Sequence, residues 1–447
     1  MVQLNDAFDN ARASRTLATT RAAGTPSTSS PSSTRPSTTP SNGPLPSLSP
    51  STLRLLCLLA SLFTPLRLSP SFAPTLQHVK SLLFSKQYLA AFGTPGEEGE
   101  RWREAYVSRW TPARAVVYER VWGEVGVAGM LGWADGEGEK GGKGEESEEE
   151  ELEEERKRAR RRREWRREGK TQAEIDELEK EEEVKERLER EKQRRTEKEE
   201  QPDEVGVLMI GAGAGAEVVA LGAALGAEAE AEDAARQPDQ PRRKRPRVKV
   251  QAVDQGQWGS LLTKMRDGLT KEWPVLSPSA DGEDGGFEVD FLQADALTAF
   301  SSEPSSSTAS SPAPPPPQPA LLHSPRLITI CFTISELLLQ SRASTLRFLS
   351  SLSSSSLPGT HLLIIESASL SLIALGSSGQ SFPLGGFLDL ALCGKKGEKG
   401  IWEKLRGEEG KWYRMPIGAE EAYNPVGSGA TVKLENTRVL LRLYRRK

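Results

Sequence analysis

A short apolar run, a glycine-rich turn and a second apolar run follow one another near the middle of the chain. Residues 205–210 (VGVLMI) have the character of a strand, residues 211–215 (GAGAG) form the turn, and residues 217–225 have helical length. Glycine is needed in such a turn because a side chain would hold the backbone away from a ligand lying across it. The free N–H groups at the start of the helix attract polar or anionic groups. The segment predicts the first unit of a nucleotide-binding α/β sheet.

Metal and disulfide chemistry have few residues to draw on. The chain has three histidines, far apart in sequence, and three widely spaced cysteines, Cys57, Cys331 and Cys393. The cysteines form neither a metal-ligand pattern nor a disulfide framework, which fits a reducing, intracellular compartment. The formal net charge of −4 hides strong local asymmetry and predicts little about partners. We expect no metal site and no histidine-dependent catalytic triad.

The N-terminal part divides into a polar leader and a helical region. Residues 1–51 are rich in Ser, Thr and Pro and should be disordered, whereas 52–127 carries apolar residues at helical spacing. The apolar stretch 53–66 is about 14 residues long, and membrane spans need roughly 20, so we expect a packed helix and no membrane association. Thr111 and Pro112 predict a helix start that separates one helix ending near Trp110 from the next.

Three segments have the composition of insertions. Residues 128–204 are highly charged, first acidic and then basic, and predict a solvated spacer, with nucleic-acid binding or nuclear import as the alternative. Residues 226–247 end in the basic cluster PRRKRPR, a nuclear-localisation pattern. Residues 301–319 are rich in Ser and Pro. We expect these insertions to be flexible and to lie between the elements of the fold, where added length costs little closure entropy.

Strands and helices alternate through residues 205–447, which we assign as one domain. After the glycine turn, strand-like runs occupy 248–254, 287–295, 327–333 and 361–366, with helical segments between them. This alternation predicts a parallel, doubly wound α/β sheet of the Rossmann-like type. Residues 412–415 and 432–444 form a further strand pair without a helix between them, which makes that pair antiparallel. Seven strands are therefore expected.

Carboxylates follow the second and third predicted strands, where a bound nucleoside would lie. The spacing Gly211-x-Gly213-x-x-Ala216 also satisfies the dinucleotide fingerprint, so the turn alone is compatible with NAD or with S-adenosylmethionine (SAM). Asp254 lies where an acid accepts hydrogen bonds from both ribose hydroxyls, and Asp295 lies where methyltransferases contact the adenine amino group. Each aspartate is also suited to capping a helix. Together with the antiparallel C-terminal pair, the two aspartates favour SAM.

Several short strings resemble the fungal large-subunit (25S) ribosomal RNA uridine-N3 methyltransferases, which are class I SAM-dependent enzymes of the nucleolus. The resemblance covers residues 73–121 and 205–444. The strings that carry it are YLAAFG (88–93), RWTPAR (109–114), IGAGAGAE (210–217), FTISEL (332–337), WEKL (402–405), WYRMP (412–416), LENTR (434–438) and YRR (444–446). Met209 stands where many methyltransferases carry an acid, so Glu217 is expected to take part of that role. Ser335 stands where the family string has Asn.

The resemblance implies a site and partners. The predicted cofactor site consists of Gly211, Ala212, Gly213, Gly215, Glu217, Asp254 and Asp295. Ser335 and Glu336 are the catalytic candidates, with Glu336 assisting deprotonation of the base and Ser335 bonding a carbonyl, although helix capping would explain the pair as well. The candidates for RNA contact, through phosphate bonds and stacking, are Arg109, Trp110, Arg114 and Tyr118, for which an aromatic helix interface is the alternative. We expect a monomer in the nucleus and nucleolus that acts on ribosomal RNA in the pre-ribosome.

Two other functions are compatible with the residues alone. An NAD-dependent oxidoreductase would use the same glycine turn, and a catalytically inactive ribosome-assembly factor would keep the fold without turnover. Uridine N3 lies on the pairing edge of the base, so a methyltransferase acting there needs an unpaired or flipped nucleotide.

Overall fold

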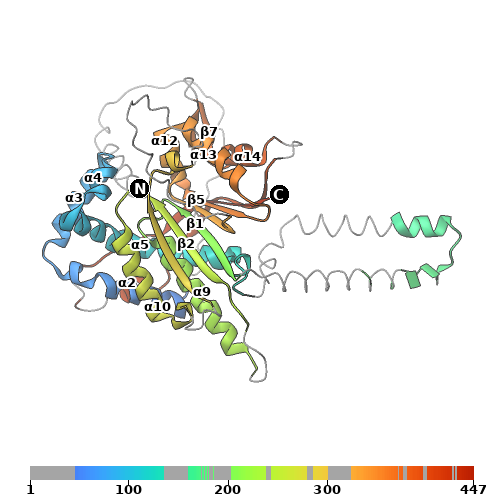
Figure 1. Ribbon diagram of the computed structural model, residues 1–447, viewed down its shortest axis with the longest axis horizontal. Helices are drawn as coiled ribbons and strands as arrows, with labels where there is room; N and C mark the ends of the chain where they lie inside the picture. The colour runs from blue at the N-terminus through green and yellow to red at the C-terminus, as the bar shows by residue number, and fades with distance from the viewer. Residues whose placement is uncertain are drawn as a thin grey trace, which may run out of the picture.

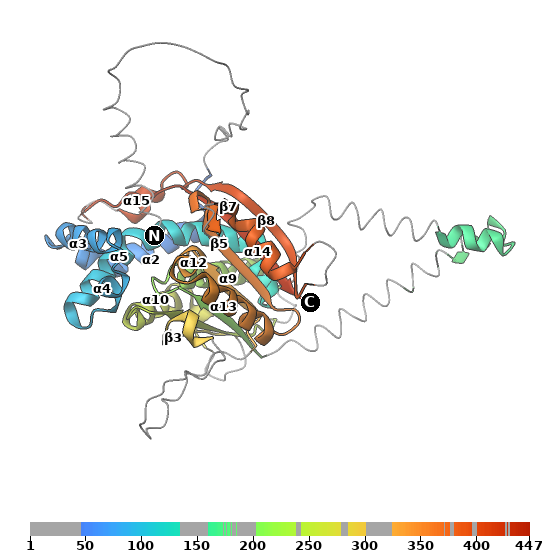
Figure 2. The same cartoon turned by 90° about the horizontal axis from the view of Figure 1, so that it is seen from above.

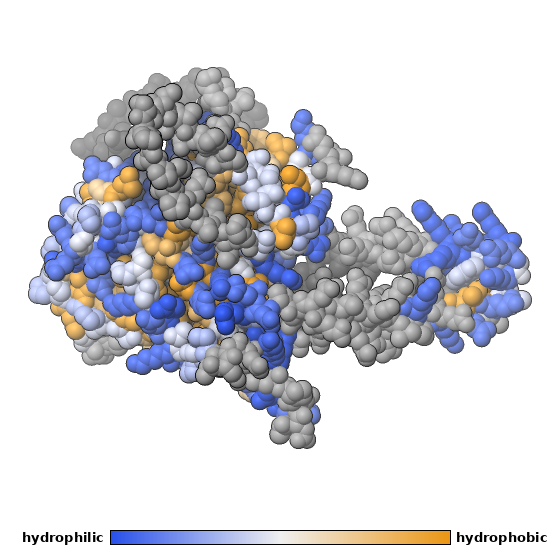
Figure 3. Space-filling model, viewed as in Figure 1, coloured by the Kyte–Doolittle hydropathy of each residue, from blue (hydrophilic) through white to orange (hydrophobic). Residues whose placement is uncertain are grey.

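The computed structural model describes residues 46–134, 203–237, 243–278, 285–300, 324–370, 372–375, 380–395, 400–424, 427 and 430–447, together with parts of 160–185. Most of the predicted leader 1–51 and of the charged segment 128–204, and all of the insertion 301–319, lie outside the described residues. Within the charged segment, residues 160–167 are helical, and the described end of the segment is mostly hydrophilic with one hydrophobic patch (Figure 3). The predicted domain boundaries at 52, 128 and 205 remain predictions.

A seven-stranded sheet forms the centre of the molecule (Figure 1). Its strand order is β3-β2-β1-β4-β5-β9-β8. Neighbouring strands from β3 to β5 are parallel, whereas β9 is antiparallel to both β5 and β8. The strands are β1 (Glu204–Ile210), β2 (Arg247–Asp254), β3 (Phe287–Gln293), β4 (Leu327–Cys331), β5 (His361–Ser367), β8 (Trp402–Tyr413) and β9 (Thr437–Arg446). This confirms the predicted doubly wound, seven-stranded Rossmann-like sheet.

Helices cover both faces of the sheet because strand residues alternate between two cores. In β1, Val207 and Met209 belong to one core, and Leu208 and Ile210 belong to the other. The first core is covered by α2 (Pro50–Leu68), α3 (Phe72–Phe84), α5 (Gly96–Val125), α9 (Ala216–Ala235) and α10 (Gly259–Glu272). The second is covered by α12 (Ile334–Gln340), α13 (Arg342–Ser355) and α14 (Leu384–Cys393). Shorter helices are α4 (Tyr88–Gly93), α6 (Val127–Met130), α11 (Ala296–Ala299) and α15 (Ala419–Tyr423), and β6 (Leu372–Leu375) and β7 (Gln380–Pro383) form a separate hairpin that the sequence did not predict.

The N-terminal helices share a core with the sheet. Helix α2 has 19 residues and is the one described helix that is long and apolar enough to cross a membrane by length and composition. Half of its most apolar stretch is buried, and Leu55, Leu59 and Phe63 are fully enclosed in the first core. Arg67 at its end donates to Tyr423 O at 2.9 Å and stacks on the Tyr423 ring. The prediction that this apolar stretch packs on the following domain is confirmed (Figure 2).

Helix α5 continues through Pro112, so the predicted helix start at Thr111 is wrong. Proline has no N–H and leaves the carbonyl four residues earlier without its helical partner. Here the hydroxyl of Tyr423 donates to that carbonyl, Ser108 O, at 2.7 Å. Thr111 is buried and donates its hydroxyl to Ala214 O at 2.8 Å, which ties α5 to the glycine turn.

Two further boundaries differ from the prediction. Helix α9 runs to Ala235, so residues 226–235, predicted as flexible insertion, are helical. The basic cluster lies at the end of the predicted insertion, beyond α9. There Lys244 pairs with Asp203, and the buried Arg245 lies 3.1 Å from Glu232. Strand β8 begins at Trp402, ten residues before the predicted strand. The prediction missed this part because an edge strand with few apolar residues shows little alternation of apolar and polar residues.

We expect Phe63→Ala to lower the free energy of unfolding by about 3–5 kcal/mol, since it leaves a cavity in the core shared by α2 and the sheet. The matched variant Phe84→Ala removes a side chain that is 62% exposed and should change it by less than about 0.5 kcal/mol. Urea unfolding followed by circular dichroism measures both. A separate, earlier transition for the N-terminal helices would contradict the shared core.

Candidate active site

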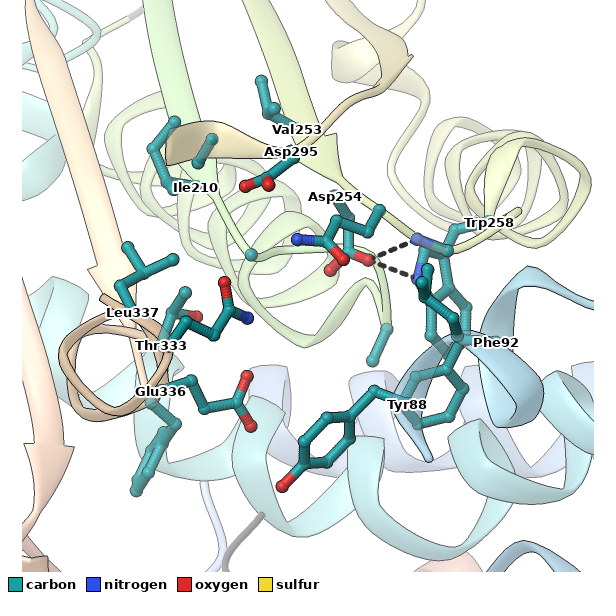
Figure 4. Close-up of a pocket in the computed structure, with 18 of the residues that line it drawn as sticks. Tyr88, Phe92, Ile210, Val253, Asp254, Trp258, Asp295, Thr333, Glu336 and Leu337 are labelled. Carbon is teal, nitrogen blue, oxygen red and sulfur yellow. Dashed lines mark hydrogen bonds between the residues drawn. The ribbon is translucent and has the colours of Figure 1, made fainter. Parts of the chain in front are cut away.

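A cavity of about 650 Å³ lies at the carboxyl edge of the parallel strands (Figure 4). This volume is in the range of small-molecule sites. Residues after β1, β2, β3 and β4 line one side, and residues of α3, α4 and α5 line the other. Sheets of this kind bind ligands at this edge, where the strand order reverses next to β1. Sheet and N-terminal helices therefore build the cavity together.

The glycine turn is held in close contact with its surroundings. Gly211 and Gly215 have φ angles of 77° and 72°, which favour glycine. A Cβ on Gly213 would lie 2.1 Å from Trp258 Cδ1 and 2.7 Å from Asp254 Cγ. Gly211 lines the cavity, whereas Ala212 is buried; Gly213 and Gly215 shape the turn without being lining residues. From the turn, Gly211 and the small residue Ala214 line the cavity, so no long side chain of the turn enters it.

Asp254 ends β2 and faces the cavity (Figure 4). Its carboxylate accepts bonds from Gly256 N at 2.8 Å, from Trp258 Nε1 at 2.9 Å and from Gly213 N at 3.3 Å. Burial raises the pKa of Asp254, and these three donors oppose that shift. The carboxylate is thus fixed in orientation and keeps lone pairs for a diol.

Asp295 caps the helix that follows β3. Its side chain accepts from Leu297 N at 2.9 Å at the start of α11, and the residue also lines the cavity. Capping and ligand binding, the two interpretations of this residue, are therefore compatible. One carboxylate oxygen is used by the cap, and the adjacent backbone at Ala294 and Ala296 also lines the cavity.

Glu336 extends into the cavity from the first turn of α12 (Figure 4). Burial raises the pKa of its carboxyl to about 7. Ser335 is 8% exposed and is not a lining residue. Its N–H donates to Glu366 Oε2 at 3.0 Å, and its side chain also bonds Glu366. The capping alternative for Ser335 is wrong, since the N-cap is Thr333. Contact between Ser335 and the substrate stays a prediction, which its position beside Glu366 does not support.

Glu366 at the end of β5 was missed by the sequence analysis. It is fully buried and accepts from the N–H groups of Ser335 and Ser367, and its pKa is raised by burial. It fixes the start of α12 and so the place of Glu336. The sequence did offer a signal for Glu366: it ends an apolar strand-like run, and a carboxylate buried there needs hydrogen-bond partners.

Tyr88 and Phe92 of α4 were also missed as site residues, although they lie in the string YLAAFG. Tyr88 and Glu336 enter the cavity from opposite walls (Figure 4). Burial, with the nearby Glu336 charge, raises the pKa of Tyr88 to about 12. The Phe92 ring lies 4.9 Å from the Trp258 ring, and Phe92 O accepts from Gln257 N at 2.9 Å. These contacts fasten the N-terminal helices over the Asp254 side of the cavity.

Glu217 is buried behind the cavity rather than in its wall. It is 3% exposed, and burial raises its pKa to about 8, while a hydrogen bond with Cys331 opposes this. Its Oε1 atom has no hydrogen-bond partner among the described residues. The prediction that Glu217 binds the cofactor directly is not supported by this position.

Two of the four predicted RNA contacts on α5 are enclosed in the protein. Trp110 and Tyr118 are 4% and 2% exposed, and this position does not support stacking on a nucleobase, which stays a prediction. The interface alternative holds for both. Arg109 pairs with Glu435 and donates to Lys433 O at 2.9 Å. Arg114 lines the cavity.

The fold and the cavity define a Rossmann-like α/β protein with a nucleoside-cofactor site at the switch point of its sheet. Residues 59–445 match the sequence profile of a protein family that is described as SAM-dependent methyltransferases. The chain belongs to this family of SAM-dependent methyltransferases. The cofactor predicted from the glycine turn and its aspartates, SAM, is thereby confirmed, and the NAD-dependent oxidoreductase is not favoured.

A curated relative is the 25S rRNA (uridine(2843)-N(3))-methyltransferase of Saccharomyces cerevisiae (strain ATCC 204508 / S288c). It is 29% identical over 246 residues, which are 53% of this chain and 60% of the relative. This chain therefore spans about 60% of the relative's length. The relative confirms the resemblance found in the sequence strings.

Solved structures with similar folds include a SAM-dependent methyltransferase from Methanosarcina mazei and the N-methyltransferase NodS from Bradyrhizobium japonicum WM9 in complex with S-adenosyl-L-homocysteine. The first has 11% identity and a TM-score of 0.28 over 55% of this chain and 93% of its own. The second has 10% identity and a TM-score of 0.25 over 54% of this chain and 78% of its own. Likenesses at these scores say nothing about substrate.

The site residues fit SAM by their chemistry: a fixed carboxylate for a diol, a turn of glycine and alanine residues, and a cavity of sufficient size. We expect Asp254→Ala to weaken binding of S-adenosylhomocysteine at least about tenfold, because hydrogen bonds to a charged group contribute about 1.5–3 kcal/mol. Isothermal titration calorimetry measures this. Asp290→Ala, which removes an exposed carboxylate on β3, is the matched control. Equal affinities of the two variants would place the ribose elsewhere.

Proposed function

We propose that this protein transfers a methyl group from SAM to N3 of a uridine in large-subunit ribosomal RNA. The observation that carries the proposal is the match to the yeast 25S rRNA uridine-N3 methyltransferase, which is 29% identical over 246 residues. The strings around Tyr88, Gly211 and Glu336, which carry that resemblance, are also the ones that line the cavity. Because the strings that resemble the uridine-N3 methyltransferases also line the cavity, they support the proposal that this protein catalyses the same reaction as the yeast enzyme.

The proposed cofactor position follows the strand ends. Asp254 accepts bonds from the ribose hydroxyls, and Asp295 with its adjacent backbone contacts the adenine. Gly211 and the rest of the turn lie under the remainder of the molecule. When bound, SAM supplies an electrophilic methyl group, so the protein contributes mainly by holding the nucleophile in line with it.

Glu336 is the proposed general base. Uracil N3 carries a proton near neutrality and attacks only after losing it. A carboxyl with a pKa of about 7 is ionised in part at neutral pH and is a stronger base than an ordinary glutamate, as efficient proton transfer requires. Tyr88 faces Glu336 across the cavity with its hydroxyl protonated, since its pKa is about 12, and is suited to donating a bond to a uracil carbonyl. Glu366 and Ser335 position Glu336 without touching the substrate.

The proposed partner is the pre-ribosome, and the proposed location is the nucleolus, with the protein acting as a monomer. In the basic cluster, Arg245 is buried, whereas Lys244 is exposed on the surface, and a role of the cluster in nuclear import stays a prediction. The target base must leave its stack to reach the cavity, because N3 is on the pairing edge.

We expect the methylation rate to rise with pH up to about 7 and then to level off, because Glu336 must be ionised to accept the proton. Glu336→Gln should lower kcat about 10²–10⁴-fold and remove this pH limb. Single-turnover transfer of labelled methyl groups to ribosomal RNA from a deletion strain measures both. Glu421→Gln, an exposed glutamate on α15, is the control. An unchanged pH profile in Glu336→Gln would exclude Glu336 as the base.

We expect ribosomal RNA from a strain lacking this protein to lose one N3-methyluridine per large subunit. Mass spectrometry of nucleosides from purified large-subunit RNA measures the loss. Re-expression of the normal chain should restore the modified nucleoside, and the Asp254→Ala variant should not. Full N3-methyluridine in the deletion strain would refute the proposed substrate, and it would leave membership of the methyltransferase family untouched.

A further inference from the structure

Arg114 has an unusual position for a cation. It lies on α5 between Trp110 and Tyr118, which are one helical turn away on either side and are both buried, so all three residues are on the inward face. Its Nη1 donates to the Tyr106 hydroxyl at 3.0 Å, and its guanidinium lies 5.6 Å from the centre of the Phe332 ring. Among the described residues it has no carboxylate partner within 4 Å, although it lines the cavity. A guanidinium partly shielded from water in this way favours an anionic ligand.

The place of Arg114 along the sheet edge narrows the choice of anion. The strand order puts Asp295 after β3, Asp254 after β2, the glycine turn after β1 and Phe332 after β4. A nucleoside with its base near Asp295 and its ribose on Asp254 directs its 5′ substituent across the glycine turn toward β4. Arg114 stands over Phe332 at that end. It therefore meets the amino-acid part of the cofactor.

The positive charge of Arg114 determines which group of the amino-acid part it can bind. SAM carries a sulfonium, an ammonium and a carboxylate, and only the carboxylate attracts a guanidinium. Among the described lining residues, Arg114 and Lys86 are the cations, and Lys86 is exposed at the rim. An RNA phosphate is the other anion to consider. It needs an open surface, which the inward face of α5 does not offer.

We propose that Arg114 binds the α-carboxylate of the methionine part of SAM and so fixes the cofactor's tail over the glycine turn. This inference rests on the cofactor placement proposed above and reassigns a residue expected from sequence to contact RNA. The planar guanidinium matches a carboxylate with two parallel N–H donors. Tyr106 and Phe332 hold its plane, so little side-chain freedom is lost on binding.

The test compares SAM with decarboxylated SAM, which differ by the carboxylate alone. The normal protein should bind SAM about 10- to 100-fold more tightly than the decarboxylated compound. Arg114→Gln should bind the two within about threefold, and Arg114→Lys should keep part of the discrimination. Arg101→Gln, an exposed arginine on the same helix, should keep all of it. Calorimetric titration gives the affinities, and thermal unfolding checks that each variant is folded.

Three results would overturn the assignment. The first is a normal protein that binds both compounds equally. The second is an Arg114→Gln variant that loses affinity for both compounds by the same factor, which indicates a structural role. The third is unchanged discrimination together with weaker binding of a uridine-containing RNA, which would assign Arg114 to a phosphate. The first two results come from cofactor-binding measurements, which need no RNA. They can therefore be interpreted even if the proposed ribosomal RNA substrate is wrong.

Discussion

The close contact between the glycine turn and the side chains around it determines how this molecule is built. Gly213 has Trp258 and Asp254 against it at distances where a Cβ would overlap. The same contact holds the Asp254 carboxylate, because Trp258 and the Gly213 N–H both donate to it. The glycine turn, Asp254 and the start of α10 are therefore one packed unit. A side chain added at Gly213 would displace Trp258 and Asp254, because the atoms around it are already close-packed.

The N-terminal helices complete the site instead of forming a separate module. Thr111 bonds the glycine turn through Ala214 O, and Phe92 packs on Trp258, so α4 and α5 are attached to the nucleotide-binding unit at two points. In consequence the cavity has a wall of Tyr88 and Arg114 that the sheet alone lacks. In the proposed mechanism, Tyr88 meets the substrate and Arg114 meets the cofactor, so the two ligands would share that wall.

Much of the fold was predictable because parallel strands buried on both faces read as apolar runs with helices between them. Asp254 and Asp295 were predictable from their place after such runs. Glu366 was not, because its importance comes from an α12 backbone N–H that only the fold brings near. Pro112 misled the prediction, since the hydroxyl that satisfies Ser108 O lies more than 300 residues further along the chain. The inward orientation of Trp110 likewise depends on α5 having sheet and helices on several sides.

That distant hydroxyl has a consequence for biosynthesis. Helix α5 is translated long before the residue that completes its hydrogen bonding at the proline, because Tyr423 lies 315 residues after Ser108. Helix α2 likewise waits for α15, whose carbonyl at Tyr423 receives Arg67. Helices α2 and α5 pack on each other and on α9, but their polar groups at Arg67 and Ser108 gain these partners only when α15 docks. Docking of α15 therefore completes a core that the N-terminal helices begin.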